Sequence, residues 1–358
     1  MSGSIEINGR RIGPGCPCYL VAEISANHNG SFEQAAEIIR AAKRAGADAA
    51  KLQTYTADTL TIRSDNEYFR IGGGTLWDGK TLYDLYTEAY TPWGWQPQLK
   101  QIANDLGLDL FSTPFDATAV DFLERMGVPA HKVASFEIVD LPLIRRIAAT
   151  GKPMIISTGM ATLEEIEEAV STARTAGADQ IVLLKCTSAY PAPSHDMNLR
   201  TIPFLVEKLG LPVGLSDHTD GIVAPVVAVT LGACIIEKHF TLSRSMRGPD
   251  SAFSLEPHEF RAMVDAVRET EEALGRIYLG ISGEEKTSRV FRRSLFVVRD
   301  IKKGELLTSE NIRSIRPGYG LHTRYLDRVL GLVASENLSA GTPLSWNLVA
   351  ELDAVAKL

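Results

Sequence analysis

Apolar, strand-forming segments recur eight times along this chain, and most are separated by segments with helical periodicity. They comprise residues 19–24, 47–52, 108–112, 130–134, 153–157, 180–186, 211–215 and 234–237. Capping boxes at Ser31 to Gln34 and at Thr162 to Glu165 mark the start of two of the intervening helices. Eight strand–helix repeats over about 275 residues are typical of a (β/α)8 barrel, so we expect an α/β TIM barrel.

The residues after the last predicted barrel helix have a different character. The segment 280–288 is polar and contains glycine, which indicates a linker. We therefore predict a barrel domain over 1–278, a linker over 279–288 and a small β-rich domain over 289–352. Within that domain, Ile301, Gly304 and Leu307 recur 37 residues later as Leu338, Gly341 and Leu344, which predicts two similar strand–turn units.

Charge and hydropathy narrow the class of protein. The formal net charge is −7 and no Lys/Arg-rich run occurs, which argues against nucleic-acid or anionic-membrane partners. The longest apolar run, 222–236, is interrupted by Pro225 and Thr230 and is shorter than the roughly 20 residues of a membrane span. The N-terminus lacks the pattern of a signal peptide, so we expect a cytoplasmic protein. The four cysteines, at 16, 18, 186 and 234, lack zinc-site spacing, and we expect all to be reduced, with Cys186 and Cys234 inside strands.

Two histidines follow neighbouring strands. His218 comes after the segment 211–215 and His239 after 234–237, so both lie at carboxyl ends, where barrels bind their ligands. A lone histidine at such a place more often satisfies a hydrogen bond than binds a metal. Two at equivalent positions in adjacent units favour a divalent-metal site, because neutral imidazole is the commonest ligand of transition metals.

The other strand ends are also polar. Carboxyl-end residues are Glu23, Lys51, Gln53, Ser112, Thr113, Lys132, Ser135, Glu137, Ser157, Thr158, Thr187, Ser188, Ser216, His218, Glu237 and His239. Hydroxyls and lysines from successive strands suit an anion with several oxygens, such as a phosphorylated carboxylic acid. A divalent ion would polarise the carbonyl of a second substrate. Alternatively, Lys51 or Lys132 could form a Schiff base, which borohydride would trap and a chelator would not inhibit.

An unusually long insertion, residues 54–91, separates the second and third strands. It contains three consecutive glycines at 72–74 and the aromatic residues Tyr68, Phe69, Trp77, Tyr83, Tyr86 and Tyr90. Long loops on the carboxyl face of a barrel commonly shape a substrate pocket. Equally, the aromatic side chains could bury one another in a packed excursion.

An ordered series of motifs resembles the sialic acid synthase family. The motifs are 21–30 (VAEISANHNG), 51–53 (KLQ), 112–115 (STPF), 157–160 (STGM), 186–191 (CTSAYP), 216–219 (SDHT), 237–241 (EKHFT) and 248–250 (GPD). They cover nearly the whole chain, and the C-terminal region resembles the antifreeze-like (SAF) domain of those enzymes. The resemblance implies condensation of phosphoenolpyruvate with an open-chain N-acetylated amino sugar, giving a nine-carbon 2-keto acid. Phosphate would leave by C–O cleavage.

The resemblance also implies roles for individual residues. His218 and His239 would bind manganese or magnesium and, with Glu23, would form the catalytic set. Phosphoenolpyruvate would contact Lys51, Thr113, Lys132, Ser135, Ser157, Ser188 and Ser216. The sugar would contact Gln53, Glu137, Tyr190, Asp250 and Arg316. In the family the tail domain reaches across a domain-swapped homodimer, so Arg316 would act in the partner's sugar site.

The insertion is informative about the sugar. Segments 74–77, 81–86 and 89–95 resemble pseudaminic acid synthases more than the N-acetylneuraminic acid enzymes, although Gly94 stands where an acidic residue is expected. The expected electrophile is then 2,4-diacetamido-2,4,6-trideoxy-L-altrose. N-acetylneuraminic and legionaminic acid synthases remain alternatives with the same mechanism. A non-catalytic carbohydrate-binding protein is a more distant alternative, because fold alone does not determine function.

Overall fold

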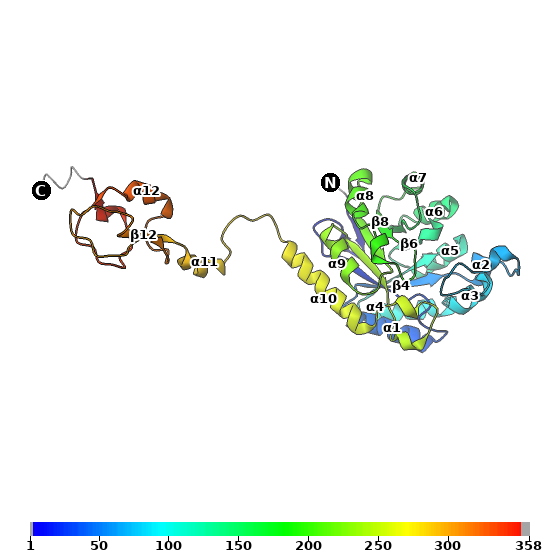
Figure 1. The fold of residues 1–358 in the computed structure, drawn as a ribbon. Coiled ribbons are helices and arrows are strands. Elements are labelled where there is room, and N and C mark those ends of the chain that lie inside the picture. The colour runs from blue at the N-terminus through cyan, green and yellow to red at the C-terminus, as the bar shows by residue number, and fades with distance from the viewer. Residues whose placement is uncertain (1–2, 352–358) are drawn as a thin grey trace. The chain divides into compact units, whose positions relative to one another are not determined.

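The computed structural model divides the chain into two compact units, Met1–Gly275 and Arg276–Leu358, and describes residues 3–351 (Figure 1). Positions 1, 2 and 352 of the predicted domains lie outside the described residues. Among the described helices, none combines the length and the apolar character that a membrane crossing requires.

The first unit is a closed barrel of parallel strands surrounded by helices (Figure 1). Its strands are β3 (Tyr19–Glu23), β4 (Ala49–Thr54), β5 (Asp109–Pro114), β6 (His131–Val133), β7 (Met154–Ser157), β8 (Ile181–Cys186), β9 (Val213–Asp217) and β10 (Ile235–His239). Each strand pairs with the next in sequence, and β10 closes the barrel on β3, with Ile235 opposite Tyr19. The predicted TIM barrel is therefore confirmed.

Helices follow the strands and cover the outside of the barrel. They are α1 (Phe32–Arg44), α4 (Gln96–Asp105), α5 (Ala117–Met126), α6 (Leu141–Ala148), α7 (Leu163–Thr175), α8 (Thr201–Leu209), α9 (Val223–Thr230) and α10 (Pro257–Leu274). The capping box at Thr162 and Glu165 is complete. At Ser31 only half of the predicted box forms, because the Gln34 side chain donates to Asn27 O instead.

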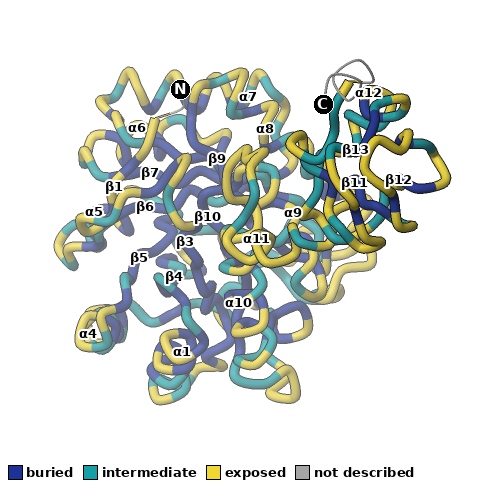
Figure 2. The backbone as a smooth tube through the Cα atoms, turned by 90° about the vertical axis from the view of Figure 1, so that its left-hand side faces the viewer, coloured by how far each residue is buried: buried dark blue, intermediate teal, exposed yellow. Residues whose placement is uncertain are grey.

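A short hairpin covers the amino-terminal end of the barrel. It consists of β1 (Ile5–Ile7) and β2 (Arg10–Ile12), which pair antiparallel. Ile5, Ile7 and Ile12 join a buried cluster with residues inside the barrel such as Phe111. Figure 2 shows the barrel strands as the buried centre of this unit, with exposure concentrated on the helices and loops. The barrel is thus closed by apolar packing at one end and leaves its polar strand ends at the other.

The predicted placement of one cysteine is wrong. Cys186 ends β8 as expected, whereas Cys234 immediately precedes β10 rather than lying inside it. All four cysteines are free thiols, as expected from the sequence.

The long insertion folds into short helices, α2 (Ala57–Leu60), η1 (Glu67–Phe69) and α3 (Leu82–Ala89), and η2 (Trp93–Trp95) leads into α4. Tyr55 packs edge-on against Tyr86 and Phe115, so one member of the aromatic series, Tyr86, packs against another aromatic residue of the insertion. Tyr68 is 81% exposed and takes no part in that packing.

The second unit contains short strands and helical turns. They are α11 (Glu285–Ser288), η7 (Arg289–Phe291), β11 (Ser294–Val297), β12 (Ile312–Ile315), η8 (Thr323–Tyr325), α12 (Leu326–Val329), β13 (Val333–Ala334), η9 (Trp346–Leu348) and β14 (Val349–Ala350). Part of the predicted linker is therefore helical, at α11. A separate apolar cluster that includes Leu295, Ile312 and Leu344 forms the core of this unit.

The 37-residue repeat corresponds to a local symmetry of backbone pairing. Ile301 and Leu338, which occupy equivalent positions, exchange both backbone hydrogen bonds at 2.8 Å. Two further bonds are related by the same offset, Gly304 N to Ala334 O and Gly341 N to Val297 O, each at 2.8 Å. The two predicted strand–turn units thus pair with each other around an approximate two-fold axis.

Candidate active site

Three buried ionisable side chains meet at the carboxyl ends of β4, β6 and β10. Glu237 Oε1 lies 3.7 Å from Lys51 Nζ and 3.9 Å from Lys132 Nζ. Ser216 Oγ, from the neighbouring β9, donates to the same oxygen at 3.3 Å. Burying two ammonium groups is costly, and a carboxylate between them offsets part of that cost. The arrangement holds two cations ready for an anionic ligand.

Lys51 also forms an ion pair with Glu23, at 2.6 Å from Nζ to Oε2, and donates to Thr113 Oγ1 at 3.2 Å. Gln53 Nε2 donates to the other Glu23 oxygen at 3.0 Å. Burial raises the pKa of Glu23 to about 7, against the opposing charge of Lys51. Burial lowers the pKa of Lys51, but Glu23 and Glu237 together raise it above its usual value. Glu23 is therefore suited to proton transfer near neutral pH, and Lys51 to charge pairing rather than to a Schiff base.

Lys132 and three hydroxyls form a second part of the cluster. Lys132 Nζ donates to Ser157 Oγ at 2.6 Å, and Gly159 N donates to Ser135 Oγ at 3.1 Å. A Cβ at position 159 would lie 2.3 Å from Ser188 Oγ and 2.7 Å from Ser135 Oγ, so only glycine permits this approach. Convergent hydroxyls, a backbone N–H and an ammonium group are the donors that a phosphate group requires.

His218 and His239 face each other across the end of β9 and β10, with ring centroids 5.3 Å apart. His218 Nδ1 lies 3.0 Å from Thr187 O, so donation from Nδ1 to this carbonyl leaves the Nε2 lone pair free for a ligand. His239 Nδ1 is buried without a hydrogen-bond partner in the described part of the chain. Burial lowers the pKa of His239 well below its ordinary value, which keeps the ring neutral.

These two imidazoles fit a divalent metal ion. Burial lowers the pKa of His218, but Cys186 and the Thr187 carbonyl together hold it above its ordinary value, so a metal ion would compete with a proton for Nε2. Across residues 3–351, no group of three or more His, Cys, Asp or Glu side chains is arranged to hold an ion. His218 and His239 would therefore supply two ligands, and substrate or water oxygens would supply the others.

Aromatic side chains form a wall beside the histidines. The ring of Tyr190 lies 4.4 Å from that of His218 and 5.1 Å from that of Phe253, between centroids. Trp77, from the long insertion, lies 5.8 Å from Tyr190, and its Nε1 donates to Pro249 O at 3.1 Å. The insertion therefore contributes an aromatic side chain to the site.

Two carboxyl groups lie on the sugar side implied by the resemblance. Asp250 accepts hydrogen bonds from Ser25 Oγ and, at 3.2 Å, from Ala26 N. Glu137 ends η3 (Ser135–Glu137), and its Oε2 is buried without a partner among the described residues. Burial raises the pKa of Glu137 to about 7, and the Lys132 charge opposes this shift. Glu137 is therefore suited to donating as well as accepting a hydrogen bond.

Most predicted site residues belong to the barrel unit, whereas Arg316 lies in the second unit, directly after β12, and is exposed. Among the residues described above, Glu237, Ser25, Trp77 and Phe253 had no individual role in the sequence prediction. Glu237 could have been found from its spacing, because residues two apart on a strand share a face and His239 was already assigned. Ser25 lies in the motif 21–30 and Trp77 in the aromatic series of the insertion, whereas no motif of the sequence analysis contains Phe253.

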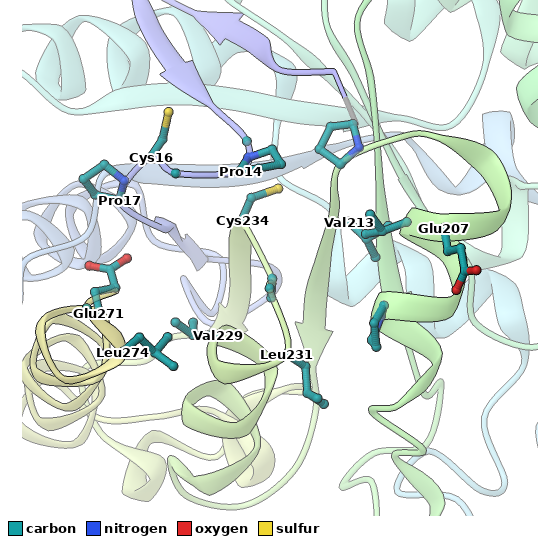
Figure 3. Close-up of a pocket in the computed structure, with 18 residues that line it drawn as sticks. Pro14, Cys16, Pro17, Glu207, Val213, Val229, Leu231, Cys234, Glu271 and Leu274 are labelled. Carbon is teal, nitrogen blue, oxygen red and sulfur yellow. The ribbon is translucent and has the colours of Figure 1, made fainter. Parts of the chain in front are cut away.

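A separate cavity lies at the amino-terminal ends of β9 and β10, with a volume of about 760 Å³ (Figure 3). Its lining includes Pro14, Cys16, Val213, Cys234 and Leu274. None of the predicted site residues lines it, and its wall is largely apolar. The polar strand ends, rather than this cavity, form the candidate active site.

Comparison with known proteins identifies the family of this chain. The NeuB family profile matches residues 38–278, and the SAF domain profile matches residues 292–350. A pseudaminic acid synthase from Campylobacter jejuni is 48% identical over 326 residues, covering 91% of this chain and 95% of that protein. A pseudaminic acid synthase from Helicobacter pylori is 47% identical over 330 residues, covering 92% of this chain and 97% of that protein.

A solved structure shares the architecture. The N-acetylneuraminic acid synthetase from Leptospira borgpetersenii, crystallised with citrate, superposes with a TM-score of 0.72. It is 32% identical, and the match covers 80% of this chain and 95% of that one. The family profile and the bacterial relatives lead to one assignment: this chain belongs to the NeuB family and carries a C-terminal SAF domain.

Proposed function

We propose that this enzyme condenses phosphoenolpyruvate with 2,4-diacetamido-2,4,6-trideoxy-L-altrose to form pseudaminic acid and phosphate. The observation that carries the proposal is the position of Lys51 and Lys132 around Glu237, beside two facing imidazoles. The cations and hydroxyls suit the anionic substrate, and the imidazoles suit activation of an aldehyde. Pseudaminic acid synthases that are nearly half identical over nine-tenths of the chain support the choice of reaction.

Phosphoenolpyruvate would bind through charge-assisted hydrogen bonds. Lys132, Ser135, Ser157 and Ser188 form a cradle for the phosphate, while Lys51, with Thr113 and Ser216 nearby, suits the carboxylate. The methylene carbon of phosphoenolpyruvate then attacks the aldehyde carbon and forms the new C–C bond. Water adds to the former enol carbon, and the C–O bond to phosphate breaks, leaving a 2-keto acid and inorganic phosphate.

Proton transfer is the role that we propose for Glu23. Its raised pKa allows it to give a proton to the aldehyde oxygen as that oxygen becomes a hydroxyl, or to accept one from the attacking water. Lys51, at 2.6 Å, stabilises the ionised form and thereby limits the rise of that pKa.

We further propose that His218 and His239 bind manganese or magnesium. The unpartnered Nδ1 of His239 and the Thr187 contact of His218 support this proposal. When bound, the ion would act as a Lewis acid toward the aldehyde oxygen.

The sugar side of the site favours a deoxy, doubly acetylated substrate. Trp77, Tyr190 and Phe253 form an aromatic wall suited to a methyl or acetyl group. Gln53, Glu137 and Asp250 supply polar groups for hydroxyl and amide contacts. The alternative is synthesis of N-acetylneuraminic or legionaminic acid by the same mechanism. The similarity to an N-acetylneuraminic acid synthetase, at 32% identity, supports this alternative.

The family resemblance also suggests the assembly and location of the enzyme. We propose a domain-swapped homodimer in which Arg316 of one protomer contacts the sugar bound by its partner. We place the enzyme in the cytoplasm, where phosphoenolpyruvate is made. Sedimentation at micromolar concentration tests the dimer, and a monomeric, fully active enzyme would contradict it.

The experiment that tests the reaction is release of phosphate from phosphoenolpyruvate with manganese present. The altrose derivative, the legionaminic acid precursor and N-acetylmannosamine are offered separately, each with and without EDTA. We expect turnover with the altrose derivative alone, and none after EDTA. Turnover with another sugar would agree with the proposed mechanism but would change the proposed substrate. If no sugar leads to phosphate release, the result would support the alternative of a non-catalytic carbohydrate-binding protein.

A further inference from the structure

Ser25 has a backbone conformation that is rare for a residue with a side chain. It lies two residues after the end of β3, with a φ of 49°. Glycine adopts this left-handed region freely, but other residues are disfavoured because their Cβ approaches the backbone. The side chain is only 2% exposed. Such conformations cluster at functional sites, so a buried serine at this position points to a use for its hydroxyl.

That hydroxyl links two residues that are far apart in the sequence, Gln53 and Asp250. Ser25 Oγ donates to Asp250 Oδ2, which also accepts from Ala26 N at 3.2 Å. Gln53 Nε2 in turn donates to Ser25 Oγ at 3.4 Å and to Glu23 Oε1 at 3.0 Å. A chain of hydrogen bonds therefore runs from Glu23 through Gln53 and Ser25 to Asp250.

The segment around Ser25 is held in place by other contacts. Asn27 Nδ2 donates to Phe240 O at 3.1 Å and to Ser254 Oγ at 2.9 Å. Asn27 Oδ1 accepts from Ser251 Oγ at 3.1 Å, next to Asp250 in the chain. Asn27 therefore ties this loop to the loop that carries Asp250 through hydrogen bonds that do not involve the Ser25 hydroxyl.

We propose that Ser25 is a positioning residue for the sugar substrate. Its hydroxyl and the Ala26 N–H hold one oxygen of Asp250, which turns the other oxygen, Oδ1, toward the ligand. The same hydroxyl fixes the Gln53 amide between Glu23 and the sugar. The inference rests on the proposed condensation, because it assigns Asp250 and Gln53 to the sugar rather than to phosphoenolpyruvate.

The test is the variant Ser25→Gly. Glycine accepts the same φ, so the loop conformation remains accessible to the variant, which loses the hydroxymethyl group and with it the hydrogen bonds of the hydroxyl. We expect the sugar kcat/KM to fall by about 10- to 100-fold, the range for loss of a hydrogen bond to a charged group. The KM for phosphoenolpyruvate should change less than about twofold, and the melting temperature by no more than a few degrees.

Asn8→Gly is the matched control. Asn8 has a φ of 47°, nearly that of Ser25, but lies in the exposed turn of the amino-terminal hairpin. We expect this variant to keep wild-type kinetics for both substrates. A sugar kcat/KM in Ser25→Gly within about twofold of wild type would overturn the proposal, as would equal losses for the two substrates.

A second comparison tests whether Ser25 acts through Asp250. When Ser25→Gly is introduced into the Asp250→Asn variant, it should lower the sugar kcat/KM by less than about threefold. The group that Ser25 positions has already been altered in that background. The same factor in both backgrounds would contradict positioning through Asp250. All variants are assayed with whichever sugar the wild type accepts. If the wild-type enzyme is inactive with every sugar, the proposed function is refuted. If the wild-type enzyme is active and Ser25→Gly is unaffected, only this inference is refuted.

Discussion

Lys51 Nζ lies 2.6 Å from Glu23 Oε2, with both side chains buried at the carboxyl end of the barrel. The pair joins the group that we propose for proton transfer to one that we propose for binding the anionic substrate. Each charge therefore depends on the other for its protonation state.

Replacing Lys51 with methionine should strongly reduce activity and stability. The change leaves two buried carboxyl groups, Glu23 and Glu237, without the ammonium group that they share. Loss of one partner of a buried ion pair typically lowers the free energy of unfolding by about 3 to 5 kcal/mol. We expect kcat/KM for phosphoenolpyruvate to fall at least about 100-fold, measured by phosphate release. Lys208→Gln, at an exposed position on α8, is the control and should behave as wild type. Retention of activity within about tenfold would exclude the assigned role of Lys51.

The raised pKa of Glu137 predicts that the stability of the protein depends on pH. This pKa is raised to about 7 by burial, so between about pH 4.5 and 7 the folded state keeps a proton that the unfolded state has released. Stability therefore falls as the pH rises through this window. Glu137→Gln should make this loss of stability smaller, with the part due to Glu23 remaining, and should stabilise the protein by roughly 1 to 3 kcal/mol at pH 8.

Urea denaturation of wild type and variant at pH 5 and pH 8 measures this difference. Glu168→Gln, on the exposed face of α7, serves as the control and should leave the pH profile unchanged. If Glu137→Gln and wild type lose equal stability between the two pH values, the raised pKa of Glu137 is not responsible.

His239→Ala should weaken metal binding. Removal of one of two imidazole ligands is expected to lower manganese affinity at least about 100-fold, measured by calorimetric titration without substrates. His195→Ala is a suitable control, because that side chain is 82% exposed and ion-pairs only with Asp196 in the described structure. Unchanged manganese affinity in His239→Ala would place the metal elsewhere.

Trp77 should influence the choice of sugar. Trp77→Ala removes the ring beside Tyr190 and the hydrogen bond to Pro249 O, so we expect a roughly 10- to 100-fold loss of kcat/KM for the altrose derivative. Trp77→Phe keeps an aromatic ring, so its kcat/KM for the altrose derivative should lie between those of Trp77→Ala and the wild type. Tyr68, which is 81% exposed in the same insertion, provides the control Tyr68→Ala, and this variant should keep the wild-type kcat/KM for every sugar. An equal loss for every sugar would indicate a general structural role instead.

Local patterns carried the prediction of the barrel. Each barrel strand could be recognised from a few neighbouring residues, as Val213–Asp217 and Ile235–His239 show, and the number of repeats determined the fold class. His218 and His239 could be paired because equivalent positions in adjacent βα units lie side by side. The three-residue strands of the amino-terminal hairpin are too short to give a periodic signal, and the prediction missed them.

By itself, the sequence determined the barrel, the small second domain and the polar residues at the strand ends, because those features depend on short-range periodicity and on topology. Only the tertiary structure decided that Ser25 binds Asp250, 225 residues away, and that Trp77 reaches Pro249, 172 residues away. It also decided that Glu23 and Glu137 have raised pKa values. Such contacts and shifts depend on which side chains the folded chain buries together, and no local pattern encodes that burial.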